Sequence, residues 1–324
     1  MSLAGKKILI TGGAGFIGSN LAEHFVKQND VVVLDNLSTG HLQNIEHLIG
    51  LSNFQFIEGD IRDLATCLNH SKDVDLIYHQ AALGSVPRSI NDPITTNQVN
   101  IDGFLNMLNA AREQKVERFI YAASSSTYGD SKALPKVEEN IGKPLSPYAV
   151  TKLVNELYAD VFYKLYETKV IGLRYFNVFG LRQDPNGAYA AAIPKFINKF
   201  ASGEAPTIHG DGLQSRDFTH VDNVILANEL AGTTTNPDAF GEVFNVACGK
   251  AVVLTDLVST LKEELAQFDS SVSKVGVVNG PERIGDIKHS LASIDKISRI
   301  LGYQPVTHFN EGIKKTINWY WENR

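Results

Sequence analysis

Tyr148 and Lys152 have the residue types and the spacing for acid–base chemistry on a hydroxyl group. Residues four apart on a helix lie one turn apart on the same face, so the phenol and the ammonium should be neighbours. A nearby positive charge stabilises a phenolate, so we expect Lys152 to lower the pKa of Tyr148 and make it a base near neutral pH. The alternative is an ordinary pair on a helix surface.

A serine-rich run at 124–127 precedes this pair and follows an expected strand. Ligands of parallel sheets sit in the crevice at the carboxyl ends of the strands, so a hydroxyl there faces the reacting atoms. Ser124 could therefore bond the reacting oxygen and relay its proton. A polar turn is the alternative.

A glycine-rich segment near the start of the chain predicts a dinucleotide site. Gly12, Gly15 and Gly18 follow a short apolar stretch at 6–10 and open a helical pattern at 17–27. A strand-to-helix turn of this kind needs glycine for positive φ, and it lets backbone N–H groups approach a pyrophosphate. The context of strand, turn and helix separates this motif from a plain glycine turn.

Two aspartates end the next two expected strands. Asp35 closes the strand at 31–35, and its carboxylate suits a ribose diol but would repel a 2′-phosphate, which indicates NAD rather than NADP. Asp60 closes the strand at 54–60 and could accept a hydrogen bond from the adenine amino group. A cap at a strand end and a turn aspartate are the respective alternatives.

These residues need a sheet that brings the ends of its strands together. Apolar periodicity predicts strands at 6–10, 31–35, 54–60, 76–79, 118–123 and 170–175, with helices at 17–27, 104–114 and 148–165. This alternation predicts an α/β fold with a Rossmann-type doubly wound parallel sheet. Beyond about residue 177 the rhythm loosens, and we expect a smaller, less regular α/β segment that covers the open edge of the sheet.

The bulk composition excludes several classes of protein. The net charge of -6 argues against a nucleic-acid or anionic-membrane partner, so an anionic ligand must be held by local donors. Cys67 and Cys248 lack the spacing of a metal site, and so few cysteines suit a reducing cytoplasm. The apolar run at 8–10 is too short for a signal peptide, and no apolar stretch reaches membrane-spanning length. We therefore expect a cytoplasmic enzyme without a metal or a membrane anchor.

Segments spread over the whole chain carry a family resemblance: TGGAGFIG at 11–18, Asp35 with Asn36, HQAA at 79–82, ALGSVPRS at 82–89, SSSTYGD at 124–130, PYAVTK at 147–152 and RYFNVFG at 174–180. The sequence resembles the extended short-chain dehydrogenase/reductases, and among them the nucleotide-sugar 4-epimerases. It is most similar to the group that interconverts UDP-N-acetylglucosamine and UDP-N-acetylgalactosamine, or their uronic acids.

The resemblance implies a catalytic set and an NAD site. The catalytic Tyr, Lys and hydroxyl residue fall on Tyr148, Lys152 and Ser124. The implied cofactor-binding residues are Gly12, Gly15, Phe16, Ile17, Gly18, Asp35, Asn36, Asp60, Ile61, Gln80, Ala81, Ala82, Tyr148, Lys152 and Tyr175.

The resemblance also implies a UDP-sugar site. Arg216 takes the diphosphate-binding position and Arg283 is a second candidate, because the guanidinium fork matches diphosphate oxygens; surface ion pairs are the alternative. Asn177 is expected at the sugar and diphosphate, and Asp286 near the uridine ribose. The full set is Gly84, Ser125, Ser126, Tyr148, Asn177, Ala191, Ala192, Arg216, Arg283, Asp286 and Ser290.

Two small residues bear on the choice of sugar. Gly84 stands where many galactose-type epimerases carry a lysine, which leaves room beside the cofactor. Ser290 matches the position that gates the sugar pocket, where a bulky Tyr resembles epimerases restricted to glucose and galactose. A small residue leaves space for an N-acetyl group, so UDP-N-acetylhexosamines are the expected substrates.

The reaction implied is a 4-epimerisation through a 4-keto sugar, in which hydride leaves carbon 4 for NAD and returns to the opposite face. A 4,6-dehydratase or a uronate decarboxylase would need an acid just after Ser124, where this chain has Ser125, Ser126 and Thr127. Epimerases of UDP-glucose/UDP-galactose, or of UDP-N-acetylhexosaminuronic acids, remain open, with Arg88 and Lys195 as candidates for a uronate carboxylate. A non-catalytic NAD-binding sensor of the same fold is a further alternative.

The expected organisation is an NAD-binding Rossmann domain at 1–176 and a mainly UDP-sugar-binding domain at 177–324, with some segments returning to the first. The resemblance implies a homodimer joined through the helix around Phe104 and the helix of Tyr148. It also implies a role in surface polysaccharide biosynthesis.

Overall fold

The computed structural model describes residues 3–186, 191–281 and 288–323. Its strands are β1 (Lys7–Thr11), β2 (Asp30–Asp35), β3 (Phe54–Glu58), β4 (Leu76–His79), β5 (Arg118–Ser124), β6 (Val170–Tyr175), β7 (Val178–Phe179), β8 (Thr207–His209), β9 (Ser215–Asp217), β10 (Thr219–His220), β11 (Val243–Val246), β12 (Ala251–Val253) and β13 (Val278–Gly280).

The α-helices are α1 (Phe16–Phe25), α2 (Leu64–His70), α3 (Val86–Asn91), α4 (Pro93–Asn97), α5 (Gly103–Glu113), α6 (Pro147–Tyr166), α7 (Ala192–Ala201), α8 (Val221–Thr233), α9 (Leu254–Leu265), α10 (Asp295–Leu301) and α11 (Phe309–Glu322). Short 3-10 turns are η1 (Leu42–Asn44), η2 (Glu46–Leu48), η4 (Ser125–Tyr128), η5 (Pro237–Ala239) and η6 (Ser270–Lys274), and η3 (Gln98–Asp102) is a π-helical turn.

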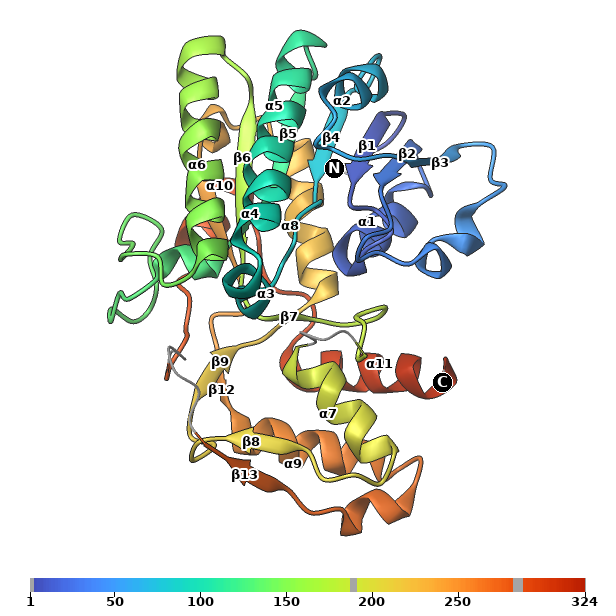
Figure 1. Ribbon diagram of the computed structural model, residues 1–324, viewed down its shortest axis with the longest axis vertical. Coiled ribbons are helices and arrows are strands. Elements are labelled where there is room, and N and C mark those ends of the chain that lie inside the picture. Colours follow the sequence, from blue (N-terminus) through green and yellow to red (C-terminus); the bar gives the residue numbers. More distant parts are fainter. Residues whose placement is uncertain (1–2, 187–190, 282–287, 324) are drawn as a thin grey trace.

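A parallel sheet forms the body of the molecule, with the strand order β11-β6-β5-β4-β1-β2-β3 (Figure 1). The chain runs outward from β1 to β3, returns to β4 beside β1, and then continues in the other direction. Ligands of doubly wound sheets bind where the strand order reverses in this way. The predicted Rossmann-type doubly wound sheet with a smaller C-terminal part is confirmed.

The expected strands appear within two residues of their predicted bounds. The largest difference is at β3, which ends at Glu58 and not at Asp60. The reason is local: the Asp60 carbonyl accepts from the Asp63 N–H at 3.1 Å, so Asp60 begins a turn. The predicted helices at 104–114 and 148–165 correspond to α5 and α6.

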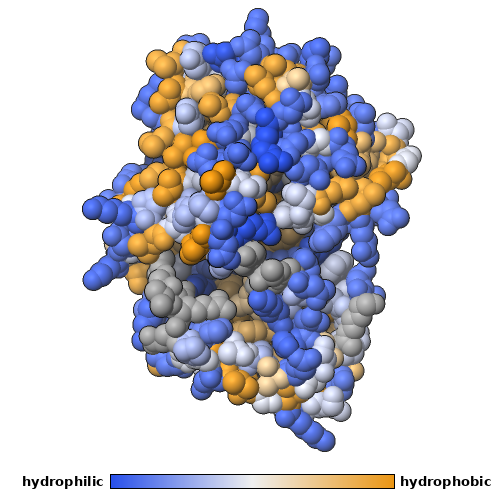
Figure 2. Space-filling view, viewed as in Figure 1, coloured by the Kyte–Doolittle hydropathy of each residue, from blue (hydrophilic) through white to orange (hydrophobic). Residues whose placement is uncertain are grey.

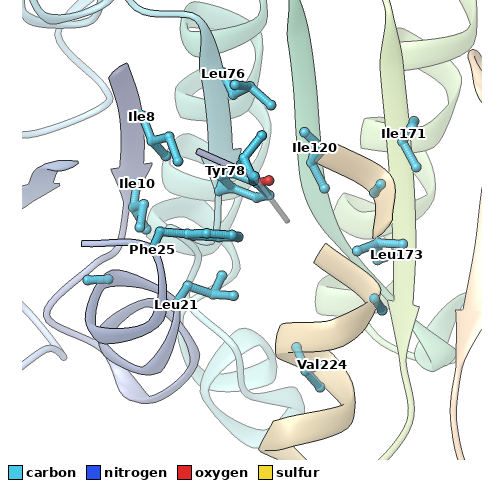
Figure 3. Close-up of a cluster of buried hydrophobic side chains, with 14 of the residues drawn as sticks. Ile8, Ile10, Leu21, Phe25, Leu76, Tyr78, Ile120, Ile171, Leu173 and Val224 are labelled. Atoms are coloured by element: carbon cyan, nitrogen blue, oxygen red, sulfur yellow. The ribbon is translucent and has the colours of Figure 1, made fainter. Parts of the chain in front are cut away.

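Helices cover both faces of the sheet and bury its apolar residues. On one face, α1 and α8 enclose a core in which Phe25 stacks on Tyr78 with ring centroids 4.7 Å apart. Figure 3 shows side chains of both helices meeting those of the strands, including Leu21, Val224, Ile8, Ile120 and Leu173. On the other face, α2, α5 and α6 pack through Cys67, Phe104, Met107, Leu108, Ala159 and Phe162. Residues on both faces of β1, β2, β4, β5 and β6 are therefore buried, which explains their near-continuous apolar runs, whereas the edge strand β3 exposes Gln55 and Glu58.

The segment after residue 177 does not cover the open edge of the sheet, contrary to the prediction. Part of it becomes the edge, because β11 pairs with β6 and buries Phe244 and Val246 completely. The short strand escaped the sequence pattern because it stands alone between irregular segments. The rest forms a lobe beyond the carboxyl ends of the strands, which contains α7, α9, α11 and the small β-pairs (Figure 1).

Within residues 3–186, 191–281 and 288–323, no helix is both long and apolar enough to cross a membrane. The same described residues contain no group of three or more His, Cys, Asp or Glu side chains placed to hold a metal ion.

Candidate active site

A cavity of about 490 Å³ lies at the carboxyl ends of the body strands, and we call it the cofactor cavity. Every residue that the sequence assigned to NAD lines it, together with Gly84, Ser124 and Ser125. The structure therefore brings these positions to one place, although their individual contacts with NAD stay predictions.

The glycine turn between β1 and α1 forms one wall of the cofactor cavity. Gly12 has φ +69°, and a Cβ there would lie 2.7 Å from the Cα of Ala81. A Cβ on Gly18 would lie 2.7 Å from the Cα of Gly13 and would also clash with the Gly12 carbonyl. Gly15 is the N-cap of α1 and brings no side chain to its first N–H groups. The turn is therefore open toward an anion, as a pyrophosphate site at a helix N-terminus requires.

Two aspartates, Asp35 and Asp60, line the cofactor cavity, and their surroundings shift their pKa values in opposite directions. The Asp35 carboxylate accepts from the N–H of Ala14 at 3.0 Å and of Leu37 at 2.8 Å, and burial raises its pKa. Asp60 is paired with Arg62 and also accepts from the Asn36 amide at 2.9 Å; the Arg62 bond holds its pKa at about 2. Asp60 is thus already engaged by a cation, which leaves it less capacity for adenine than the sequence suggested.

Helix α6 presents the catalytic pair. It begins where Ser146 Oγ accepts from the Ala149 N–H at 3.1 Å, with Pro147 at the first helical position. Tyr148 and Lys152 follow on its first two turns. The Lys152 ammonium donates to the Ala122 carbonyl of β5 at 2.7 Å and lies 6.0 Å from the centre of the Tyr148 ring.

The electrostatics of the pair correct one prediction. Burial raises the pKa of Tyr148, and a hydrogen bond with Ser124 only partly opposes this. We expected Lys152 to lower that pKa, but its ammonium donates to the Ala122 carbonyl, and the net shift of the Tyr148 pKa is upward. Lys152 is itself buried, and the loss of hydration lowers its pKa to about 8 although the Glu156 carboxylate raises it.

A polar network behind α6 fixes the orientation of this helix. Glu156, one turn after Lys152, accepts from Arg174 of β6 through both carboxylate oxygens at 2.9 and 2.8 Å. Both side chains are buried, and Arg174 also donates to the Glu138 carbonyl at 2.9 Å. A bidentate buried pair of this kind holds α6 against β6 in one rotation.

The residues of the cofactor cavity fit a dinucleotide with a polar nicotinamide end. The Gln80 amide nitrogen is buried without a partner among the described residues, while its oxygen accepts from Tyr175 at 3.2 Å. An unsatisfied buried donor costs free energy and suits a site that a ligand completes. A Cβ placed on Gly84 would meet nothing within 4 Å, so the cavity wall is open there.

A second cavity of about 530 Å³ lies in the lobe, between α7, β8 and β9, and we call it the lobe cavity. Asn177, Val178 and Gln183 line both cavities, so the two are neighbours. Figure 2 shows the surface hollowed between the body and the lobe. Asn177 has φ +37° and its amide donates to the Asp217 carbonyl at 3.1 Å, which fixes the chain at this junction.

The lobe cavity gathers part of the predicted UDP-sugar site. Ala191, Ala192 and Arg216 line it, and the Arg216 guanidinium donates to the carbonyls of Ser215 at 2.9 Å and Lys288 at 3.2 Å. Arg283 and Asp286 lie outside the described residues.

Two predicted substrate residues lie apart from both linings. Ser126 is half-buried, and its hydroxyl has no partner among the described residues. Ser290 is also half-buried; its N–H donates to the Ser215 carbonyl at 3.0 Å, which places it beside β9.

Several cavity residues were missed or undervalued in the sequence. Lys195, weighed for a uronate, lines the lobe cavity, as do Lys199 and His209, whereas Arg88 is absent from the described lining of either cavity. Lys195 and Lys199 are four residues apart on α7. This spacing in the sequence could have predicted that both ammonium groups lie on one face of a helix. The run 38–40 lines the cofactor cavity because it follows Asp35 at the end of β2.

Comparisons with known proteins agree with this geometry. Residues 8–247 match the NAD dependent epimerase/dehydratase family. The UDP-glucose 4-epimerase of Mycolicibacterium smegmatis is 34% identical over 322 residues, which are 97% of this chain and 98% of that protein.

Two solved structures are similar over nearly their whole length. The UDP-N-acetylglucosamine 4-epimerase from Methanobrevibacter ruminantium M1, in complex with UDP-N-acetylmuramic acid, has a TM-score of 0.93 at 37% identity and covers 99% of this chain and 100% of its own. The UDP-glucuronic acid 4-epimerase from Bacillus cereus, in complex with UDP-glucuronic acid and NAD, has a TM-score of 0.87 at 32% identity and covers 98% and 100%. The chain therefore belongs to the NAD-dependent epimerase/dehydratase family, as an NAD-dependent enzyme of its UDP-sugar 4-epimerase group.

Proposed function

We propose that this enzyme interconverts UDP-N-acetylglucosamine and UDP-N-acetylgalactosamine. One observation carries the proposal: the Tyr148–Ser124 hydroxyl pair lines a cofactor cavity that shares Asn177 and Gln183 with a second cavity bearing Arg216. A hydroxyl-bearing sugar at the junction would meet the acid–base pair, while its diphosphate and nucleotide extend into the lobe.

Tyr148 is the acid–base residue in this proposal. Its phenol exchanges a proton with the sugar 4-hydroxyl, directly or through the Ser124 hydroxyl, which lines the same cavity. When bound among the residues of the cofactor cavity, NAD would supply the acceptor and donor of the carbon 4 hydride and a positively charged ring. That charge favours the phenolate, which the protein alone does not, since burial raises the pKa of Tyr148.

The 4-keto sugar must present its other face before hydride returns. This requires firm binding of the nucleotide and weak binding of the sugar, and binding energy remote from the reacting carbon supplies the first. Lys195, Lys199 and Arg216 place positive charge around the lobe cavity for a diphosphate. The junction itself is lined by the neutral side chains of Asn177, Val178 and Gln183, and the small residues Gly84 and Ser125 line the cofactor cavity.

The N-acetyl preference rests on small residues at two positions. The open space around a Cβ on Gly84 leaves room beside the cofactor. Ser290 donates its N–H to the Ser215 carbonyl beside β9, and it is the family resemblance, not the described lining of either cavity, that links its small side chain to space for an N-acetyl group.

Other reactions of the fold have less support. UDP-glucose/UDP-galactose would be accepted by the same acid–base pair, and Lys195 on the lobe cavity gives a uronate carboxylate one cationic partner. A 4,6-dehydratase needs an additional acid beside the hydroxyl residue, where the structure has Ser125 and Ser126 of η4. A non-catalytic NAD sensor would not need Tyr148, Lys152 and Ser124 together in one cavity.

The test is incubation with UDP-N-acetylglucosamine, UDP-glucose and the two corresponding uronates, with products read by proton NMR. The proposal expects UDP-N-acetylgalactosamine to appear fastest. Conversion of the unacetylated hexose alone would overturn the substrate assignment, and no conversion of any sugar would overturn the reaction.

The proposed enzyme is a cytoplasmic homodimer that supplies surface polysaccharide synthesis. The surface of α6 supports the dimer, because Val150, Leu157, Val161 and Leu165 are 47%, 58%, 44% and 68% exposed and lie along one stripe of the helix. Figure 2 shows apolar side chains gathered at the upper left, where Figure 1 places α6.

A further inference from the structure

Arg182 joins the loop at 181–186 to the cofactor-binding helix α1. Its Nε donates to Ser19 Oγ at 3.1 Å and its terminal nitrogen donates to Asn20 Oδ1 at 2.8 Å. The same guanidinium pairs with Glu23 at 2.6 Å. One planar side chain thus reaches acceptors at positions 19, 20 and 23 of one helix, a geometry that a guanidinium offers and an ammonium does not.

The connection is partly shielded from solvent and holds Arg182 in an uncommon backbone conformation. The Arg182 side chain is 9% exposed, and its backbone has φ +64°, in the left-handed region that costs a residue with a side chain about 1 kcal/mol or more. Asn20 reinforces the join by donating to the Leu181 carbonyl at 3.1 Å and to the Phe16 carbonyl at 2.8 Å. Such a backbone persists only where the surroundings fix it.

The two joined elements serve different ligands. Helix α1 carries Gly15 and Phe16 at the cofactor cavity. Gln183, the residue after Arg182, lines both the cofactor cavity and the lobe cavity. Its amide donates to the Val178 carbonyl at 3.1 Å, its amide oxygen is buried without a partner among the described residues, and its carbonyl accepts from Tyr320.

We propose that Arg182 is a positioning residue that fixes the substrate-side loop against the cofactor helix, so that bound NAD and the nucleotide sugar meet in one arrangement. The inference rests on the proposed function for its substrate. Arg182 itself is absent from the described lining of the cofactor and lobe cavities, so its effect passes through α1 and Gln183.

The experiment compares Arg182→Met, Arg182→Lys and a matched control, His24→Ala. His24 lies on the same helix and is bonded at 3.1 Å to Glu229 of α8, away from both cavities. Each variant of the purified NAD-containing enzyme is assayed for KM and kcat with UDP-N-acetylglucosamine, for UDP affinity by calorimetric titration, for NAD kept after gel filtration, and for Tm.

The proposal expects Arg182→Met to raise KM and the Kd of UDP about tenfold, with kcat per NAD-containing site within about twofold, and to lower the fraction of NAD kept. Arg182→Lys should give values between those of the parent and Arg182→Met. Its ammonium can keep the ion pair with Glu23 but cannot also reproduce the hydrogen bonds to Ser19 and Asn20. His24→Ala should lower Tm and leave KM and UDP affinity unchanged.

A loss of Tm in Arg182→Met with KM, UDP affinity and NAD retention at the parent level would overturn the positioning role. If Arg182→Met does not fold, Arg182→Lys decides by the same comparison with His24→Ala. Absence of epimerisation in the parent enzyme would count against the proposed function alone, because UDP affinity and NAD retention would still report on Arg182.

Discussion

Replacing Lys152 by Met should change how the stability of the NAD-free protein depends on pH. Lys152 is 3% exposed, and burial lowers its pKa from the ordinary 10.5 to about 8. Below pH 8 both the folded and the unfolded chain carry the charge, and burying it costs about 3 kcal/mol, from the size of the pKa change. Between pH 8 and 10.5 the folded protein has released the proton while the unfolded chain retains it, so the free energy of unfolding rises with pH.

Methionine has similar length and does not titrate, so the difference between the two proteins isolates Lys152. Urea unfolding at pH 7, 8, 9 and 10 should show the parent gaining about 1.4 kcal/mol per pH unit over Lys152→Met above pH 8. Other groups that titrate in this range contribute equally to both proteins and cancel. A difference that stays flat from pH 7 to 10 would refute the reasoning, because it would mean that Lys152 ionises as freely in the folded protein as in water.

Four further outcomes follow from the same geometry. Tyr148→Phe should lower kcat at least about 100-fold while NAD remains bound, as checked by product NMR and the absorbance of the released cofactor; full activity would exclude Tyr148 as the acid–base residue. Gly18→Ala should abolish NAD binding in equilibrium dialysis, because a Cβ there would lie 2.7 Å from Gly13. Ser290→Tyr should lose activity on UDP-N-acetylglucosamine selectively. An equal decline in activity on UDP-glucose would contradict the prediction that the small Ser290 side chain leaves space for the N-acetyl group. Leu157→Glu should give a monomer by light scattering after gel filtration, since Leu157 is 58% exposed on α6; an unchanged mass would place the dimer contact elsewhere.

The sheet and the cofactor cavity could be predicted from local patterns. Strands buried on both faces produce apolar runs, and their carboxyl ends are where Gly12, Asp35 and Ser124 occur in the sequence. Parallel topology then brings these ends together, and every residue predicted for NAD lines one cavity. Motif spacing indicated Gly12, Gly15, Gly18, Asp35 and the Tyr148/Lys152 pair, whereas the family resemblance supplied positions such as Gln80 and Tyr175.

Long-range arrangements could not be obtained in this way. The partner of Lys152 is a carbonyl of β5 and not the neighbouring phenol, and no sequence spacing reports which acceptor an ammonium chooses. The edge strand β11 is only four residues long and is separated from β6 by the whole first part of the lobe. The three contacts of Arg182 with α1 likewise join positions about 160 apart.

The chain crosses between the body and the lobe several times, because β11 returns to the sheet after the first part of the lobe. The chain leaves the body after β6, comes back for α8 and β11, leaves again for β12 and α9, and returns for α10 before α11 ends in the lobe. A fragment that stopped at residue 176 would expose the unpaired hydrogen-bonding groups of β6 along an edge, and such an edge invites aggregation. The lobe therefore cannot be exchanged between enzymes as a cassette at a single junction: a chimaera that changes the sugar pocket must respect each crossing, and substitution of individual pocket residues is the safer route to a new specificity.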